Sequence, residues 1–302
     1  MMMGRILVSL MALLALPVLP GRAVATNMDF DGYQRSFEMA VPATAPRPLP
    51  VVLVLHGGGG TSSEIRAYSH FDEIAQSQGV LVVYPQGVHR SWNDGRAVPD
   101  FRGKDHDADD VAFLMAVVDS LARTGLADPH RLYIAGLSSG GMMAMRLACE
   151  LPERVAGIAV VAANMPANLD CAPSRPVPAM FFNGTDDRYV PWAGGDILQW
   201  ANIDRGKVLS VEDSLALWRR IDGCSGEIKD ETVTKSKRLG SRRLTSESCS
   251  GAPVVQYVTD GGGHVWPGAH QGPGGDALLG VVDHDLDATS LIWDFFKNLP
   301  GR

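Results

Sequence analysis

The chain has 302 residues, of which 45% are hydrophobic and 20% charged, a composition typical of a globular enzyme rather than a collagen-like, coiled-coil or disordered chain. This length is enough for one large domain with a substantial buried core. The formal net charge of −7 argues against strongly anionic partners, so we expect binding neither to nucleic acid nor to an anionic membrane surface.

Residues 1–25 have the pattern of a secretory signal peptide. Arg5 precedes the apolar run Ile6–Leu19, and Ala23-Val24-Ala25 supplies the small residues of a cleavage site. An uncleaved membrane anchor is the alternative, but the apolar run is shorter than the roughly 20 residues that span a bilayer. We therefore predict cleavage after Ala25, secretion to the extracellular space or the periplasm, a single catalytic domain over residues 26–302, and no membrane attachment after cleavage.

Strands and helices alternate along the rest of the chain, which predicts an α/β fold with a mostly parallel sheet covered by helices on both faces. In chain order, the predicted strands are Tyr33–Val41 (antiparallel), Pro50–His56, Val80–Tyr84, Arg131–Gly136, Val155–Val161, Val177–Asn183 and Val254–Thr259. The predicted helices are Glu64–Gln78, Asp109–Arg123, Gly140–Glu150, Ser210–Ile221 and Ala288–Leu299. The polar stretch 230–250 alternates weakly and is interpreted as a hairpin.

A nucleophile motif lies between one of these strands and the following helix. Gly136-Leu137-Ser138-Ser139-Gly140 matches the pattern G-x-S-x-G, whose glycines let strand and helix approach closely through a tight turn. Such a turn raises the serine hydroxyl above the sheet, at the positive end of the helix dipole. We predict that Ser138 is a catalytic nucleophile; the alternative is a glycine-rich turn without chemistry.

A serine hydroxyl is a weak nucleophile that needs a base, and in this type of site the histidine follows the serine in the chain. Three histidines follow Ser138, and of these His264 lies in a glycine-rich loop directly after the last predicted strand. His270 and His284 lie in polar surroundings and are expected to be solvated. His264 is therefore the predicted base.

The acid that orients such a histidine is expected on the loop after the strand Val177–Asn183. Asp186 and Asp187 both lie on that loop and are both candidates. The local motif favours Asp187, and the other aspartate is expected to cap the loop or face solvent.

The negative oxygen that develops during acyl transfer needs backbone N–H donors. The N–H of Ser139 is one candidate, and the loop after the strand Pro50–His56 is expected to supply the other. That loop contains the glycine run 57–60, which is entropically unfavourable unless the backbone must approach a ligand closely. A merely flexible loop is the alternative, and His56 is interpreted as a structural residue of this loop.

The segment 105–110, Asp-His-Asp-Ala-Asp-Asp, contains the residue types of a metal site. It precedes a predicted helix, so we interpret Asp109 or its neighbour as a helix cap whose acids are favoured by the helix dipole. No metal and no other cofactor is predicted.

Several aromatic residues lie in the loops between predicted strands. Trp92, Trp192 and Trp266, together with Tyr189, are candidates to line an aromatic substrate-binding cleft. Ordinary packing in the core or on the surface is the alternative for each of them.

Four cysteines behind a signal peptide suggest two disulfides. Three pairings are possible, and we favour the pairing of neighbours in sequence, Cys149 with Cys171 and Cys224 with Cys249. A zinc site is disfavoured because the chain contains no CxxC or HxxxH spacing.

Six motifs together resemble the secreted poly(3-hydroxybutyrate) depolymerase and feruloyl esterase family of α/β-hydrolases: LHGGGG (55–60), VVYPQGVHRSWNDGR (82–96), DDVAFL (109–114), GLSSGGMMAMRLACE (136–150), NGTDDRYVPW (183–192) and GGGHVWPG (261–268). The resemblance implies a triad of Ser138, Asp187 and His264, because the family pattern is G-T-x-D-x-x-V-P. It also implies oxyanion donors near Gly58 and Ser139, and the four cysteines match family positions. The chain departs from the family at Ser139, where Asn is common, and at Asn183, where His is common.

The expected function is that of a secreted serine esterase that acts through an acyl-enzyme on hydroxyalkanoate esters or oligomers. A feruloyl esterase that releases hydroxycinnamates from plant cell-wall polysaccharide is the alternative substrate class. An inactive hydrolase fold that binds a glycan is the alternative of another class, and the intact predicted triad argues against it. The sequence shows no linker to a second binding domain, which favours soluble esters over solid polyester.

Overall fold

The computed structural model describes residues 24–96, 108–198, 204–235, 239–250 and 254–302. Nearly all of the predicted signal peptide lies outside these ranges, as do Asp105, His106 and Asp107. The predicted cleavage site falls inside the first described strand, because Ala25 pairs with Glu38 of the next strand. Cleavage there removes only the beginning of that strand.

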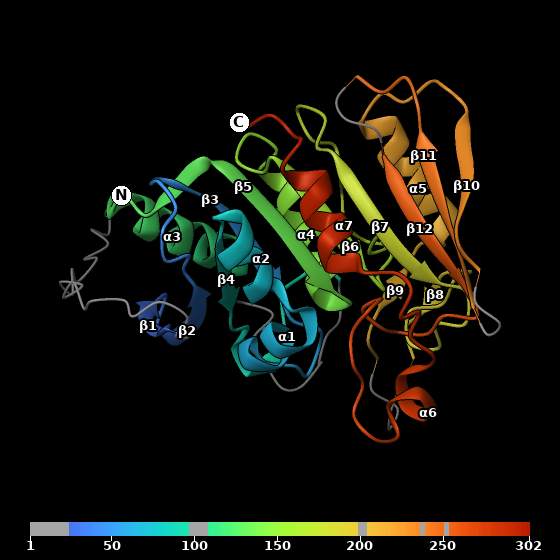
Figure 1. Cartoon of the computed structure of the whole chain (residues 1–302), viewed down its shortest axis with the longest axis horizontal. Helices are drawn as coiled ribbons and strands as arrows, with labels where there is room; N and C mark the ends of the chain where they lie inside the picture. Colours follow the sequence, from blue (N-terminus) through green and yellow to red (C-terminus); the bar gives the residue numbers. More distant parts are fainter. Residues whose placement is uncertain (1–23, 97–107, 199–203, 236–238, 251–253) are drawn as a thin grey trace, which may run out of the picture.

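One large sheet contains ten strands of the described chain, in the order β1-β2-β4-β3-β5-β6-β7-β12-β11-β10 (Figure 1). From β4 to β12 in this order the neighbouring strands are parallel, and antiparallel hairpins extend both edges. The strands are β1 Val24–Phe30, β2 Tyr33–Ala40, β3 Leu49–Leu55, β4 Leu81–Pro85, β5 Ala127–Leu137, β6 Gly157–Val161, β7 Ala179–Gly184, β10 Ile228–Lys235, β11 Gly240–Ser246 and β12 Val255–Asp260. A separate small ribbon pairs β8 (Gly195–Asp196) with β9 (Lys207–Val208).

Helices cover both faces of this sheet (Figure 1). Helices α3, α4 and α5 bury their apolar residues against one face, and α1, α2 and α7 against the other. The helices are α1 Ser62–Ser69, α2 Phe71–Gln78, α3 Asp110–Arg123, α4 Ser139–Glu150, α5 Val211–Ile221, α6 Gly275–Leu279 and α7 Ala288–Phe296, with a short 3₁₀ turn at Val88–Arg90. This is the predicted α/β-hydrolase architecture.

Strand β3 shows why the sheet needs a helix layer on each face. Val51, Leu53 and Leu55 pack into the core on the side of α3 and α4, whereas Val52 and Val54 pack into the core on the side of α1 and α2. Alternate side chains of a strand point to opposite faces, so an uninterrupted apolar strand must be covered twice.

Two differences from the predicted elements have local causes. The predicted helix Glu64–Gln78 is two helices, α1 and α2, because His70 between them adopts a left-handed conformation with φ 55°. The polar stretch 230–250 forms most of the β10–β11 hairpin, which pairs with β12 and so belongs to the main sheet.

Both predicted cysteine pairs are joined in the structure, Cys149 with Cys171 and Cys224 with Cys249. The first pair links the end of α4 to the segment before β7. The second closes the base of the β10–β11 hairpin.

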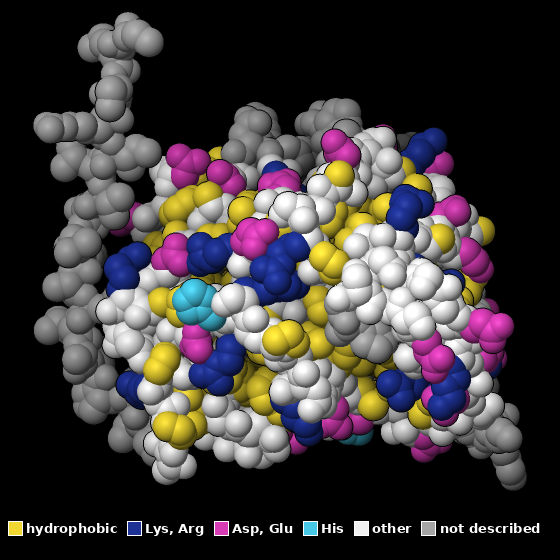
Figure 2. Space-filling model, turned by 90° about the horizontal axis from the view of Figure 1, so that it is seen from above, with side chains coloured by type: hydrophobic (Ala, Val, Ile, Leu, Met, Phe, Trp, Pro, Cys, Tyr) yellow, Lys and Arg dark blue, Asp and Glu magenta, His cyan; other side chains and the backbone are white. Residues whose placement is uncertain are grey.

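Acidic and basic side chains are interspersed over the face of the molecule that Figure 2 shows. Short ion pairs in the molecule include Arg146–Glu150 and Arg66–Asp72. Among the described helices, none has the length and apolar character needed to cross a membrane.

Candidate active site

The predicted catalytic residues come from separate loops at one edge of the sheet. Ser138 follows β5, Asp187 lies just beyond β7, and His264 lies just beyond β12. The glycine run 57–60 follows β3. Because β3, β5, β7 and β12 run in the same direction, their carboxyl ends lie at the same edge.

Ser138 occupies a strained turn between β5 and α4. Its φ and ψ are 55° and −121°, a conformation that L-residues rarely adopt. Two glycines allow the turn: a Cβ on Gly136 would lie 2.2 Å from the carbonyl oxygen of Gly140, and a Cβ on Gly140 would lie 2.3 Å from that of Leu55. The backbone N–H of Ser138 donates to Val161 at 2.8 Å, which fixes the turn to β6. The Ser138 side chain is therefore presented at the carboxyl edge of the sheet, where it is only partly buried.

Asp187 is the aspartate that contacts His264. Its Oδ2 lies 2.8 Å from Nδ1 of His264, and its Oδ1 accepts the backbone N–H groups of Tyr189 and Val190 at 2.8 and 2.9 Å. Asp186 has an exposed side chain, and its backbone N–H donates to Gly262. With the Asp187 carboxylate as the acceptor of this hydrogen bond, Nδ1 of His264 is the donor and Nε2 is left as an acceptor.

Close backbone contact holds the loops of Asp187 and His264 together. A Cβ on Gly184 would lie 2.2 Å from the carbonyl oxygen of Gly262, so only glycine fits there. The hydroxyl of Thr185 accepts the N–H of Gly261 at 2.8 Å, and the N–H of Thr185 donates to Thr259 at 3.1 Å. Asp187 and His264, the predicted acid and base, are thereby held in register by the backbone.

A second segment, residues 279–283, also supports the His264 loop through backbone hydrogen bonds. The N–H of His264 donates to Leu279 at 2.6 Å, and that of Gly263 donates to Val281 at 3.1 Å. Further along, the N–H of Gly268 donates to the carbonyl of Asp283. The sequence pattern contains no signal for this support, because its contacts are made by backbone groups.

The glycine run 57–60 lies against the predicted nucleophile: a Cβ on Gly57 would be 3.4 Å from Cβ of Ser138. Within this loop, Gly59 donates to Arg90 and Gly60 donates to Gly57, whereas the N–H of Gly58 has no partner among the described residues. The N–H of Ser139 belongs to the first turn of α4, where backbone donors have no partner within the helix. Gly58 and Ser139 thus remain the candidate oxyanion donors.

His56 shapes this loop as a structural residue. It is buried, its Nδ1 lies 2.8 Å from the carbonyl oxygen of Gly57, and its Nε2 accepts the N–H of Gly87 at 3.0 Å. Burial lowers the pKa of His56 to about 4, so the imidazole is neutral with its proton on Nδ1. Both ring nitrogens are used, which fixes the glycine loop to the end of β4.

Two of the three predicted substrate-binding tryptophans, Trp92 and Trp266, are core residues, which favours the packing alternative for them. Trp92 is 2% exposed, packs on the ring of His56 and donates its indole N–H to the carbonyl of that residue. Trp266 is 1% exposed and donates to Thr289. Trp192 is only half-buried and donates to Glu212, so it alone of the three can present a face to a substrate. A loop sequence cannot separate these cases, because both roles use aromatic residues.

The segment 105–110 does not supply a metal site within the part that is described. Asp109 caps α3 by accepting the N–H of Ala112, as predicted. Asp110 is buried, pairs with Arg35 at 2.6 Å and accepts the N–H of Asn93 at 2.7 Å; burial raises its pKa. No group of three metal-ligating side chains converges in the described ranges.

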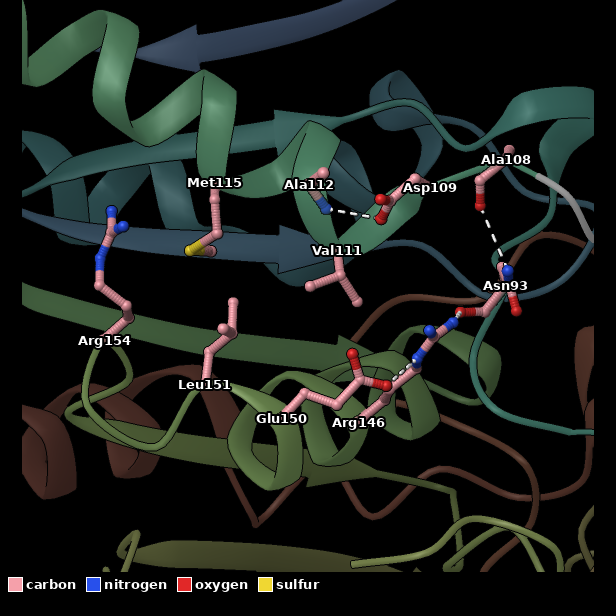
Figure 3. Close-up of a pocket in the computed structure, with 10 residues that line it drawn as sticks. All are labelled: Asn93, Ala108, Asp109, Val111, Ala112, Met115, Arg146, Glu150, Leu151 and Arg154. Carbon is pink, nitrogen blue, oxygen red and sulfur yellow. Dashed lines mark hydrogen bonds and ion pairs between the residues drawn. The ribbon is translucent and has the colours of Figure 1, made fainter. Parts of the chain in front are cut away.

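A hollow of about 580 Å³ lies away from the catalytic candidates, between α3 and the carboxyl end of α4 (Figure 3). Met115 and Leu151 give it an apolar side, and Arg146, which pairs with Glu150, borders the other side. None of Ser138, Asp187 and His264 lines it.

Comparison with known proteins places the chain in a family. Residues 33–232 match the family described as putative esterase, and the chain belongs to this family. It is 32% identical over 92% of its length to the putative esterase NocK of Nocardia uniformis subsp. tsuyamanensis, of which it covers 84%. The protein is thus a carboxylic ester hydrolase with the α/β-hydrolase fold.

More distant relatives carry the two names that the sequence motifs suggested. The chain is 27% identical over 84% of its length to feruloyl esterase B of Piromyces equi, and it spans 43% of that protein. It is also 27% identical over 84% of its length to a poly(3-hydroxybutyrate) depolymerase of Ralstonia pickettii, of which it spans 54%. An acetyl xylan esterase from Aspergillus awamori has the same fold, with a TM-score of 0.54 at 14% identity over 80% of this chain and 94% of that chain.

Proposed function

We propose that the protein is a secreted serine esterase in which Ser138, His264 and Asp187 form the catalytic triad. The observation that carries the proposal is the 2.8 Å contact between Asp187 and Nδ1 of His264, at the sheet edge where the strained turn presents Ser138. This contact leaves Nε2 of His264 as the acceptor for the proton of the serine hydroxyl.

In the proposed reaction, Oγ of Ser138 attacks the ester carbonyl while Nε2 of His264 takes its proton. The N–H groups of Gly58 and Ser139 stabilise the oxyanion, and the imidazolium then protonates the leaving alcohol. Water, activated by the same imidazole, hydrolyses the acyl-enzyme and restores Ser138. Asp187 accepts the hydrogen bond from Nδ1 throughout and stabilises the imidazolium.

We propose hydroxyalkanoate esters and oligomers as the substrate class. The support is the similarity to a poly(3-hydroxybutyrate) depolymerase over 84% of the chain and to a poly(3-hydroxyalkanoate) depolymerase over 85%. Feruloyl esters are the second candidate, favoured by the relative named feruloyl esterase B and by the half-buried aromatic rings of Tyr189 and Trp192 on the loop of the catalytic acid.

A panel of substrates tests both the proposed esterase activity and the proposed substrate class. Purified protein is assayed on p-nitrophenyl butyrate, methyl ferulate and soluble 3-hydroxybutyrate oligomers, beside a film of crystalline polyester. We expect hydrolysis of the oligomers with a higher kcat/KM than that of methyl ferulate, and slow erosion of the film. Preferential hydrolysis of methyl ferulate would transfer the assignment to the second candidate.

The Ser138→Ala variant is the control for the chemistry. Loss of the nucleophile is expected to lower kcat by on the order of 10⁴-fold or more on every ester while the fold survives. Near-normal turnover by a folded Ser138→Ala variant would refute the triad.

Secretion is proposed from the signal-peptide pattern of residues 1–25 and from the two disulfides, which form in oxidising compartments. Amino-terminal sequencing of the protein recovered from the periplasm or the medium is expected to begin at Thr26. Recovery of full-length protein in the reducing cytosol only would contradict this.

A further inference from the structure

Tyr189 contacts both partners of the proposed acid–base pair. Its backbone N–H donates to Oδ1 of Asp187 at 2.8 Å, and its ring stacks on the imidazole of His264 with centroids 5.0 Å apart and an interplanar angle of 28°. The backbone of Tyr189 is itself fixed, because its carbonyl accepts the N–H of Leu198 at 2.9 Å. The ring is therefore presented to His264 by an anchored backbone.

We propose that Tyr189 is the positioning residue of His264, acting through the face of its aromatic ring. The proposal rests on the proposed role of His264 as the base. A single hydrogen bond from Nδ1 to Asp187 fixes one point of the imidazole but leaves the ring free to rock about that point. A flat ring stacked on the imidazole restricts this motion and thereby keeps Nε2 directed toward Ser138.

The stacked ring also acts on the charge that His264 gains during the reaction. When Nε2 takes the serine proton, the imidazole becomes a cation that faces the electron-rich surface of the tyrosine ring, an attractive arrangement. This interaction is stronger in the transition state than in the resting enzyme, so its loss should appear in kcat rather than in KM.

Two other roles for Tyr189 make different predictions. If the ring were only a wall of the substrate site, its removal would raise KM and leave kcat nearly unchanged. If the phenolic hydroxyl mattered, phenylalanine would be as damaging as alanine. The stacking role requires that phenylalanine, which keeps the ring face, restores function.

The experiment compares Tyr189→Phe, Tyr189→Leu and Tyr189→Ala with Arg188→Ala, a matched control at the neighbouring exposed residue. For each variant kcat and KM are measured on p-nitrophenyl butyrate, after thermal unfolding shows that the protein is folded. We expect Arg188→Ala and Tyr189→Phe to stay within about twofold of wild type, and Tyr189→Ala to lose roughly tenfold in kcat with KM changed less than about twofold.

Tyr189→Leu keeps apolar bulk without a ring face, so it is expected to lose several-fold in kcat even if the alanine variant does not fold. Wild-type kcat in Tyr189→Leu and Tyr189→Ala, an increase in KM alone, or a phenylalanine variant as impaired as alanine would each overturn the inference. His264→Ala is measured in parallel: if it stays active, the proposed function fails, whereas an inactive His264→Ala beside a fully active Tyr189→Ala overturns only the role of Tyr189.

Discussion

Two adjacent aspartates have opposite environments in this site. Asp187 is buried, and its carboxylate accepts hydrogen bonds from two backbone N–H groups and contacts His264, whereas Asp186 is exposed. The chain turns between them: the N–H of Asp187 donates to the carbonyl of Gly184 at 3.3 Å, whereas the N–H of Asp186 donates to Gly262 at 2.9 Å.

We therefore expect Asp187→Asn to lower kcat by roughly 10⁴-fold, because an amide cannot hold the imidazole in the correct tautomer or stabilise its cation. Asp186→Asn should stay within about twofold of wild type and serves as the isosteric control. Steady-state kinetics on p-nitrophenyl butyrate measures both, and the reverse ranking would move the acid to Asp186.

At the scale of elements, the β10–β11 hairpin is connected to His264, the proposed catalytic base. Asp283 is buried, and its Oδ2 accepts the hydroxyls of Thr234 on β10 and Ser241 on β11 at 2.9 and 2.6 Å. The hydroxyl of Ser241 also pairs with Thr259, just before the His264 loop. Asp283 ends the segment whose carbonyls hold Gly263 and His264, so the hairpin braces that loop at a distance.

Removal of this brace is predicted to affect both stability and turnover. Asp283→Ala leaves the buried hydroxyl of Ser241 and the half-buried hydroxyl of Thr234 without this acceptor, which should lower the free energy of unfolding by about 2 kcal/mol. We expect kcat to fall about tenfold as the His264 loop loosens, as measured by kinetics well below the unfolding temperature. Thr232→Val, an exposed change on the same hairpin, is the control, and unchanged kcat in Asp283→Ala would show that the brace does not reach the site.

The residue that caps the carboxyl end of helix α5, Asp222, lies where a negative charge is unfavourable. Asp222 is fully buried at the carboxyl end of the helix, and burial raises its pKa to about 7. Because the folded-state pKa lies above the unfolded value, the folded state binds the proton more tightly. The contribution of protonated Asp222 to the stability of the fold is therefore complete below about pH 4, and it is lost as the pH rises toward 7.

Asp222→Asn should therefore stabilise the protein at pH 8, by at most about 4 kcal/mol, and have little effect at pH 4. Denaturant unfolding at the two pH values measures the difference, with the exposed Asp170→Asn as the control. Equal effects of Asp222→Asn at both pH values would mean that the carboxyl group does not titrate in this range.

At the scale of the whole molecule, the features that the sequence predicts are those with local signals. Apolar strands, the G-x-S-x-G turn and the pairing of neighbouring cysteines all depend on short stretches of chain. The break at His70 has no glycine or proline to mark it, so one continuous helix was expected there. The roles of Trp92, Tyr189 and Asp283 depend on partners distant in the chain, which a single sequence does not show.

The two disulfides are predicted to differ in their effect on turnover, although both stabilise the fold. Each closes a loop, with sequence separations of 22 and 25, worth about 3 kcal/mol in the chain-entropy model. Replacing Cys149 and Cys171 by serine should lower the unfolding temperature without a change in kcat. Replacing Cys224 and Cys249 should lower both, because that pair closes the hairpin that holds Asp283. Thermal unfolding and steady-state kinetics of the two double variants test this prediction, which fails if their kcat values are equal.

The glycine contacts beneath the catalytic loops have a consequence for how this enzyme tolerates mutation. Gly140, Gly184 and Gly263 each lie where a single methyl group would overlap a neighbouring backbone carbonyl. Alanine at any of them would displace a loop that carries one of the three proposed triad residues. Laboratory evolution of substrate range is therefore best confined to side chains that face outward from these loops, such as Asp186 and Trp192. The glycines themselves should be as intolerant of replacement as the proposed triad residues that they support.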